Sequence, residues 1–230
     1  MDELALCFSE PFSSPAWGSN FVVFTSETGM TMPEDMSKSY LSRSVKYAKH
    51  HGVYLVPERF MLSNYHCMCI ISPDGEILGA GKAVYLNPEN RTGKQSARIE
   101  VFNTGFGGIF LCVDVDVYHP EVCRIASEMG ARIIVCSQHL SKAEYGSHLV
   151  VSGCWSAAQL NGVYVIAASG QFHCVCAPVT ISARGDGFIV PPSLRLPLTA
   201  RIHAAKLSHV PKRPRLGRKF YVIHREELLR

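Results

Sequence analysis

The sequence predicts an α/β protein in which mixed β-sheets are layered by helices. Short apolar runs of strand length alternate along the chain with segments whose apolar residues recur at helical spacing. Turn-forming sequences at residues 73–76 (PDGE) and 184–187 (RGDG) each separate two such runs and predict β-hairpins. Hydrophobic residues make up 47% and charged residues 18% of the chain, which is the composition of a protein with a buried core.

The expected strands are short and mostly apolar. In chain order they are Phe21–Phe24, Val53–Val56, Tyr65–Ile71 paired with Ile77–Leu86, Ala97–Asn103 paired with Gly108–Val115, Arg132–Cys136, Val163–Ala168, and Ala177–Ala183 paired with Phe188–Val190. Because helices follow some strands and hairpin partners follow others, the order predicts a mixed sheet arrangement.

Three helices are expected between these strands. The first spans Ser37–His51, with Ser37 as its N-cap and Gly52 as its stop signal. Pro120 opens the second helix, because proline is favoured in a first helical turn. The third spans Leu149–Leu160.

Charge and cysteine content narrow the class of protein. The formal net charge of +4 is mild and requires no nucleic-acid partner. No stretch of eighteen apolar residues is present, so no membrane span is expected. The nine cysteines are spread through apparent strands, which favours buried free thiols over a disulfide scaffold. With no basic leader at the N-terminus, a cytoplasmic location is expected.

The chain divides into a main domain and a tail. Residues 1–198 hold all the expected strands and helices and form the predicted domain. Residues 199–230 are expected to form a basic C-terminal arm, because the segment around Lys212 is rich in basic residues and proline. The stretch Lys206–Lys219 has few aromatic neighbours, which favours a solvated or partner-docking tail over a nucleic-acid site.

Cys112 is the first candidate for chemistry. It ends an apolar strand and precedes a helix that begins near His119 and Pro120. Ligands of layered α/β proteins gather at the carboxyl ends of strands, and helix N-termini lower the pKa of a thiol. The alternative is an ordinary core cysteine, since free cysteines are usually buried.

The residues around Cys112 resemble a known motif. Gly108 to Asp114, then His119-Pro120-Glu121, then Arg124 to Ala131 resemble the nucleophile segment of the nitrilase superfamily of carbon–nitrogen hydrolases. The interval from Cys112 to Pro120 is slightly longer than the common family pattern. The resemblance runs from Val22 to Val190 and identifies the domain as carbon–nitrogen hydrolase-like.

The resemblance implies four catalytic residues. They are Cys112 as nucleophile, Glu27 as base, Lys82 as oxyanion stabiliser and Glu89 as orienting residue, with Glu100 a less favoured substitute for Glu89. In a triad of cysteine, glutamate and lysine, the glutamate takes the thiol proton, so that the thiolate can attack an amide or nitrile carbon. The ammonium group of the lysine then stabilises the tetrahedral intermediate. A second carboxylate holds the lysine in place.

The resemblance also implies the architecture and the partners. It implies an α-β-β-α sandwich with a truncated N-terminal strand or helix, because only 21 residues precede Val22. It implies a homodimer or higher homo-oligomer, a small amide or nitrile substrate, and no metal or organic cofactor.

Other interpretations remain open from the sequence. The same fold also suits a catalytically inactive interaction protein, or an N-acyltransferase in which an amine or lipid replaces water. Cys67 with Cys69, and Cys174 with Cys176, are metal-ligand candidates together with His173. Their spacing is not that of a usual four-ligand zinc site, which favours buried cysteines.

Overall fold

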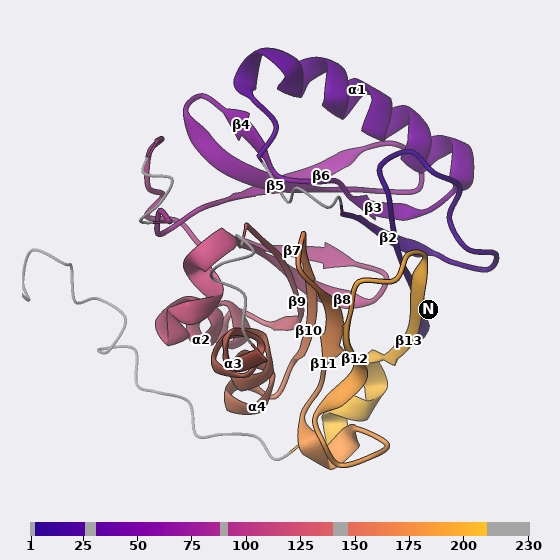
Figure 1. Ribbon diagram of the computed structural model, residues 1–230, viewed down its shortest axis with the longest axis vertical. Coiled ribbons are helices and arrows are strands. Elements are labelled where there is room, and N and C mark those ends of the chain that lie inside the picture. Colours follow the sequence, from indigo (N-terminus) through magenta and orange to yellow (C-terminus); the bar gives the residue numbers. More distant parts are fainter. Residues whose placement is uncertain (1–2, 26–30, 88–91, 140–146, 211–230) are drawn as a thin grey trace, which may run out of the picture.

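Two β-sheets pack face to face, and helices cover their outer faces (Figure 1). The computed structural model describes residues 3–25, 31–87, 92–139 and 147–210. One helix lies on the first sheet and the others lie on the second. This arrangement confirms the predicted α-β-β-α sandwich.

The first sheet, sheet A, has seven strands within the described residues, in the order β13-β1-β2-β3-β5-β4, with β6 also paired to β5. They are β1 (Glu3–Ser9), β2 (Phe21–Phe24), β3 (Tyr54–Val56), β4 (Phe60–Leu62), β5 (Tyr65–Ile71), β6 (Ile77–Lys82) and β13 (Leu198–His203). Strands β1, β2 and β3 are parallel to one another, and β13 runs antiparallel to β1. The sheet is therefore mixed, as expected.

The second sheet, sheet B, has six strands in the described residues, in the order β12-β11-β10-β9-β8-β7. They are β7 (Val101–Thr104), β8 (Gly107–Val113), β9 (Ala131–Gln138), β10 (Tyr164–Ser169), β11 (His173–Cys176) and β12 (Phe188–Ser193). The central strands β8, β9 and β10 are parallel, so their carboxyl ends meet at one edge.

The helices fill the two outer layers. They are α1 (Glu34–His51), α2 (Pro120–Glu128), α3 (Ser147–Val150) and α4 (Ser156–Asn161), with a π-helical turn Val151–Trp155 between the last two and 3-10 turns at Asp114–Tyr118, Val179–Ile181 and Ala204–His209. Gly52 ends α1 in the left-handed conformation, with φ of 63°, as the sequence predicted. The predicted N-cap is wrong, because α1 begins earlier and Ser37 lies inside it with its hydroxyl donating to the Pro33 carbonyl.

Side chains of the central strands alternate between two buried layers. On β8, Ile109, Leu111 and Val113 point into the core between the sheets. Phe110 and Cys112 point the other way, into the layer under α2 and α4. Because side chains of a strand alternate with a period of two, this register fixes the direction of Cys112.

Three expectations about the chain ends and loops need correction. Residues 177–183 are not a strand, and the second hairpin is formed instead by β11 and β12. The boundary at 198/199 cuts off β13, whose residues Ala200 and Ile202 are buried in the core between the sheets. The N-terminal strand is present as β1, whereas the connection from Glu10 to Asn20 contains turns and no helix.

Candidate functional site

Cys112 is the penultimate residue of β8, and its side chain is completely buried. Its side chain packs in the layer between sheet B and α2, beside Cys123 of that helix and Cys136 of β9. Cys112 and Cys136 are direct partners in the parallel pairing of their strands. The thiol is therefore enclosed in the core, one residue before the strand ends.

The environment of Cys112 favours the neutral thiol. Burial raises the pKa of Cys112 well above its usual value, and the neighbouring thiols of Cys123 and Cys136 raise it further. A thiol attacks a carbonyl or nitrile carbon as the thiolate, which requires a base or cation close by. Among the described residues, the side chains that act most strongly on the pKa of this thiol are Cys123 and Cys136.

Lys82 is the last residue of strand β6. Its side chain lies on the outer face of sheet A, away from sheet B. It pairs with Cys67 of β5 in antiparallel register, so both side chains lie on the same face. Cys67 packs in the layer under α1, which is the outer face of sheet A. The side chain of Lys82 is exposed, and its Nζ lies 4.6 Å from the centre of the Tyr65 ring.

The preceding residue, Gly81, faces the opposite way, toward sheet B. A Cβ on Gly81 would lie 2.9 Å from the backbone oxygen of Leu111, so the two strands approach closely there. Lys82 thus points outward from sheet A, while Cys112 points outward from sheet B. The two sheets lie between the predicted nucleophile and the predicted oxyanion stabiliser, so the structure does not bring these side chains together.

The remaining predicted residues lie elsewhere. Glu27 and Glu89 fall outside the described residues. Glu100, the less favoured substitute for Glu89, is exposed and directly precedes β7.

The turn after β8 holds a different polar group, Asp114. Its φ of 54° is in the left-handed region, which side chains other than glycine, asparagine and aspartate rarely adopt. Its carboxylate lies 3.1 Å from Nη1 of Arg59 and accepts a hydrogen bond of 3.0 Å from the backbone N–H of His139. Arg59 is 1% exposed. The carboxyl end of β8 is therefore occupied by a buried Arg–Asp ion pair.

Sequence reasoning missed this ion pair. Strand β8 continues to Val113, so the sharp turn falls at Asp114, two residues after Cys112. Arg59 gave no local signal, because it is distant in sequence and comes from the loop between β3 and β4.

Asp116 joins this turn to sheet A. Its two carboxylate oxygens accept hydrogen bonds from the backbone N–H groups of Val84 and Tyr85, at 3.0 and 2.8 Å. Val84 and Tyr85 lie shortly after β6, which ends at Lys82. Burial raises the pKa of Asp116 to about 7, although the two N–H donors oppose the shift. The carboxylate thus anchors the segment that follows Lys82.

The two sheets also meet at the end of β2. The hydroxyl of Thr25 lies 3.4 Å from the backbone oxygen of Ser169 and 3.4 Å from Nδ1 of His173. His173 stacks on Phe8, with 5.6 Å between ring centres. Burial lowers the pKa of His173 to about 4, so the imidazole is neutral at physiological pH. This histidine is a core residue that links the sheets.

The cysteine pairs do not form a metal centre in the described parts of the chain. Cys174 and Cys176 are buried with their sulfur atoms 3.8 Å apart, and Cys67 and Cys69 are buried under α1. Over residues 3–25, 31–87, 92–139 and 147–210, no group of three or more histidine, cysteine or acidic side chains is arranged to hold a metal ion. None of the helices in those ranges is long and apolar enough to cross a membrane.

Several solved structures have the same architecture as this chain. A carbon–nitrogen hydrolase from Helicobacter pylori has a TM-score of 0.72 at 14% identity, over 91% of this chain and 92% of that one. An amidase from Nesterenkonia sp. has a TM-score of 0.67 at 17% identity, over 89% and 92% of the two chains. The NitFhit protein of C. elegans has a TM-score of 0.72 at 15% identity, over 99% of this chain and 66% of that one.

These similarities are found by comparing structures and not by comparing sequences. No family model and no curated protein matches the chain. The structural likeness covers 89% to 99% of this chain. This chain therefore has the fold of the nitrilase-superfamily carbon–nitrogen hydrolases.

Proposed function

We propose that this chain is a non-hydrolytic protein with a nitrilase fold, which acts by binding a partner and not by turnover at Cys112. The observation that carries the proposal is that Cys112 and Lys82 point outward from opposite sheets. Covalent hydrolysis needs the nucleophile and the oxyanion stabiliser at hydrogen-bond distance around a single carbon. The two layers of backbone that lie between these groups support a function other than turnover at Cys112.

The Arg59–Asp114 pair supports the same proposal. It occupies the carboxyl end of β8, where a nucleophile delivered by the turn would act. Both charges are buried, and Asp114 also accepts the His139 N–H, so the carboxylate is engaged in structural contacts. An aspartate held in this way stabilises the turn and is not free to attack a substrate.

A second candidate is hydrolysis of a small amide or nitrile through Cys112, with Glu27 as base, Lys82 as oxyanion stabiliser and Glu89 as orienting residue. The order of these residues in the sequence and the shared fold favour it. One solved form of the Nesterenkonia amidase carries a covalent adduct at its active-site cysteine. An N-acyltransferase would need the same thiol. Both activities require Cys112 and Lys82 to move to one face.

Thiol labelling combined with an activity assay distinguishes these functions. The purified protein is incubated with iodoacetamide, and the labelling rate of each cysteine is followed by peptide mass spectrometry. We expect Cys112 to react no faster than Cys123 and Cys136, which are buried in the same layer. We also expect no ammonia release from short aliphatic amides or nitriles.

Two variants sharpen the result. Cys123→Ala is the matched control for Cys112→Ala, because both remove a fully buried thiol from the same cluster. Selective labelling of Cys112 that Glu27→Gln suppresses, together with amide hydrolysis lost in Cys112→Ala and kept in Cys123→Ala, would overturn the proposal in favour of the hydrolase.

A further inference from the structure

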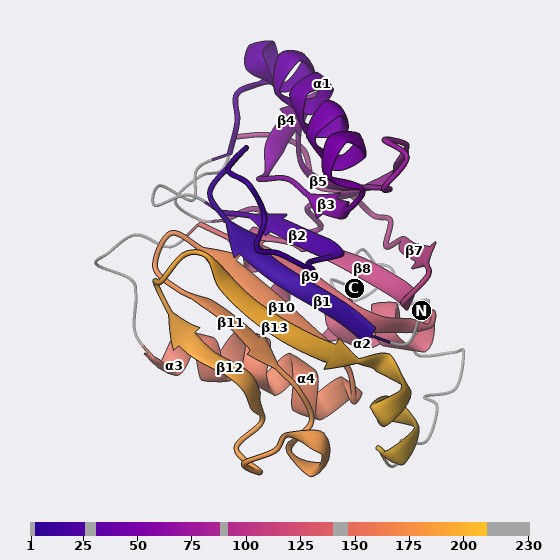
Figure 2. The ribbon, with the colours of Figure 1, turned by 90° about the vertical axis from the view of Figure 1, so that its right-hand side faces the viewer.

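The outer face of sheet A carries no helix over β1 and β13 within the described residues. Helix α1 packs on β3, β4 and β5, and Figure 2 shows the β1–β13 pair with no helix in front of it. Ala200 and Ile202 of β13 are buried in the core between the sheets. Because side chains of a strand alternate, Thr199 and Arg201 point outward, and both are exposed. The open strip therefore presents a hydroxyl group and a guanidinium group to solvent.

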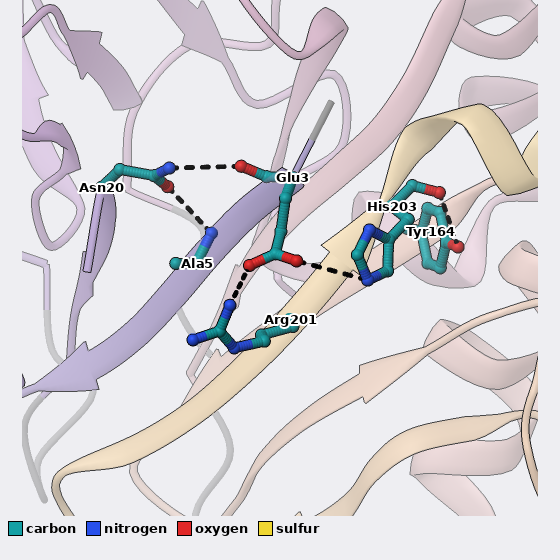
Figure 3. Close-up of polar contacts among 6 residues, drawn as sticks. All are labelled: Glu3, Ala5, Asn20, Tyr164, Arg201 and His203. Atoms are coloured by element: carbon teal, nitrogen blue, oxygen red, sulfur yellow. Dashed lines mark hydrogen bonds and ion pairs between the residues drawn. The ribbon is translucent and has the colours of Figure 1, made fainter. Parts of the chain in front are cut away.

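The connection from β1 to β2 borders this strip and carries Trp17. The side chain of Asn20 fastens the end of this connection to β1. It accepts a hydrogen bond of 2.8 Å from the N–H of Ala5 and donates one of 3.2 Å to the carbonyl of Glu3 (Figure 3). Trp17 itself is fully exposed. A single exposed apolar side chain is ordinary on a protein surface, so the role of Trp17 depends on what lies beside it.

A polar recess lies beside Trp17. Its volume is about 250 Å³, and it is hollow because Ala5 and Ser19 in its lining are small. Ser19 and Thr199 line it with hydroxyl groups, and Arg201 lines it with a guanidinium group. The volume is below the usual range of small-molecule sites, roughly 300 to 1,000 Å³. It equals the liquid volume of about eight waters, at ~30 Å³ each, which is space for one six-membered ring and its substituents.

Arg201 is neutralised within the chain. The carboxylate of Glu3 forms an ion pair with Arg201 and lies 3.5 Å from Nε2 of His203 (Figure 3). The side chain of Arg201 is 74% exposed and that of Glu3 is 35% exposed. A guanidinium has five N–H donors and a carboxylate has about four acceptor sites, so the pairing leaves donors and acceptors for a ligand. A neutral pair does not select an anion, and it suits an uncharged ligand whose hydroxyl groups both donate and accept.

We propose that the recess bordered by β1, β13 and the loop bearing Trp17 is a binding site for one pyranose ring of an uncharged carbohydrate. A pyranose has a face of C–H groups, which packs on an indole, and a rim of hydroxyl groups. In the complex, the C–H face lies on Trp17. The rim hydroxyls bind Ser19, Thr199 and the ion pair of Arg201 with Glu3.

A nucleotide is the other ligand that an exposed indole suits, because every base stacks on an aromatic ring. Its phosphate group would require a cation without a partner, whereas Arg201 is already paired with Glu3. The hydroxyl groups of the recess and the neutral ion pair therefore favour the carbohydrate.

This inference goes beyond the proposed function. The recess lies on the outer face of sheet A, whereas Cys112 lies in the layer outside sheet B. Carbohydrate binding therefore requires neither the presence nor the absence of turnover at Cys112. Failure of one proposal leaves the other standing, because each has its own residues and its own measurement.

Saturation-transfer difference NMR of the full chain tests the site. The probes are the methyl glycosides of glucose, galactose, mannose and N-acetylglucosamine, together with cellotetraose, chitotetraose and adenosine monophosphate. We expect at least one glycoside to bind with a dissociation constant of millimolar order, as for a ligand with a single ring. Equal affinities for glycoside and tetrasaccharide support a site for a free sugar, and a tighter tetrasaccharide supports a site for a glycan chain.

Four variants locate the binding. Trp17→Ala should weaken glycoside binding roughly tenfold or more, because it removes the stacking surface, and Trp17→Phe should restore part of the affinity. Thr199→Val keeps a β-branched side chain on the strand and removes one hydroxyl group, which should weaken binding roughly two- to tenfold. Leu194→Ala is the matched control, because it removes an exposed apolar side chain that does not line the recess.

Weaker binding in Trp17→Ala and Thr199→Val, with Leu194→Ala unchanged and all far-ultraviolet circular dichroism spectra alike, supports the site. The emission of Trp17, measured in a Trp155→Phe chain, should also shift to the blue when the bound glycoside is added. The proposal is overturned if no glycoside or tetrasaccharide binds, if adenosine monophosphate alone binds, or if Trp17→Ala leaves the affinity unchanged.

Discussion

The guanidinium of Arg59 lies 3.1 Å from the carboxylate of Asp114 at the carboxyl end of β8, and both side chains are nearly withdrawn from solvent. Burial lowers the pKa of Arg59, and the adjacent Asp114 opposes that shift. Replacing Asp114 by asparagine keeps a residue that tolerates the left-handed φ while removing the negative charge. We expect Asp114→Asn to lower the free energy of unfolding by roughly 3 to 5 kcal/mol.

Urea denaturation checks this value. Asp186→Asn is the control, because Asp186 pairs with Arg184 at a well-exposed site, where ion pairs contribute about 0 to 1 kcal/mol. Equal, small effects of the two substitutions would contradict a structural role for the buried pair.

Cys112 should behave as a core residue. Cys112→Ala removes a buried sulfur and should cost on the order of 1 to 2 kcal/mol, and Cys112→Ser should cost more because it buries a hydroxyl group. Cys123→Ala and Cys123→Ser should show the same order in thermal denaturation, because Cys123 lies in the same layer. A serine at position 112 that is tolerated without loss of stability would point to a more polar, accessible site.

His173 should make the fold sensitive to acid. Its pKa is near 4 in the folded protein and about 6.5 when unfolded, so the unfolded chain binds more protons between these values. Stability should therefore fall as the pH is lowered from 6.5 toward 4, by up to roughly 3 kcal/mol from this group. His173→Gln should remove this contribution to the pH dependence of the free energy of unfolding. His50→Gln, on the exposed face of α1, should leave the pH dependence unchanged.

Asp116 should have the opposite effect over nearly the same range. Its pKa is about 7 in the folded protein and 3.8 when unfolded, so the folded protein binds more protons between these two values. Its contribution to stability is fully present below the unfolded pKa and is lost as the pH rises through the folded pKa. Chemical denaturation at several pH values should show that Asp116→Asn makes stability increase more steeply with pH, and a shallower increase would contradict the shifted pKa.

Most strands and the layered α/β class were predictable from local patterns, whereas the α-β-β-α sandwich was implied by the resemblance to the nitrilase superfamily. The apolar runs that became β2, β5, β8, β9 and β10 are bounded by turns or helix signals, and α2 shows a clear apolar stripe. The buried face of α1 is less apolar, because it includes Ser37 and Ser44. Strand β13 was missed because proline and basic residues obscure the short alternation of Leu198, Ala200 and Ile202. Its partner β1 is almost 200 residues away in sequence, so no local signal reveals the pairing.

The side of sheet B toward which the Cys112 side chain points was also not predictable, but for a different reason from that for β13. Strands of a sheet covered on both faces are apolar throughout, so the sequence does not tell which residues face the other sheet. The choice depends on where the turn after β8 falls, and Asp114 marks that turn only through its backbone conformation. The contact of Asp114 with Arg59 then depends on the tertiary packing of two sheets.

The pairing of β1 with β13 also has a consequence for the order of folding. Glu3 lies opposite His203, so β1 obtains its second neighbour only after nearly the whole described chain has been synthesised. Pairings of such high sequence separation are slow to form because closing the long loop costs chain entropy. During synthesis, one edge of β1 stays open until β13 emerges from the ribosome, and a nascent chain is most exposed to mispairing and chaperone capture in that interval.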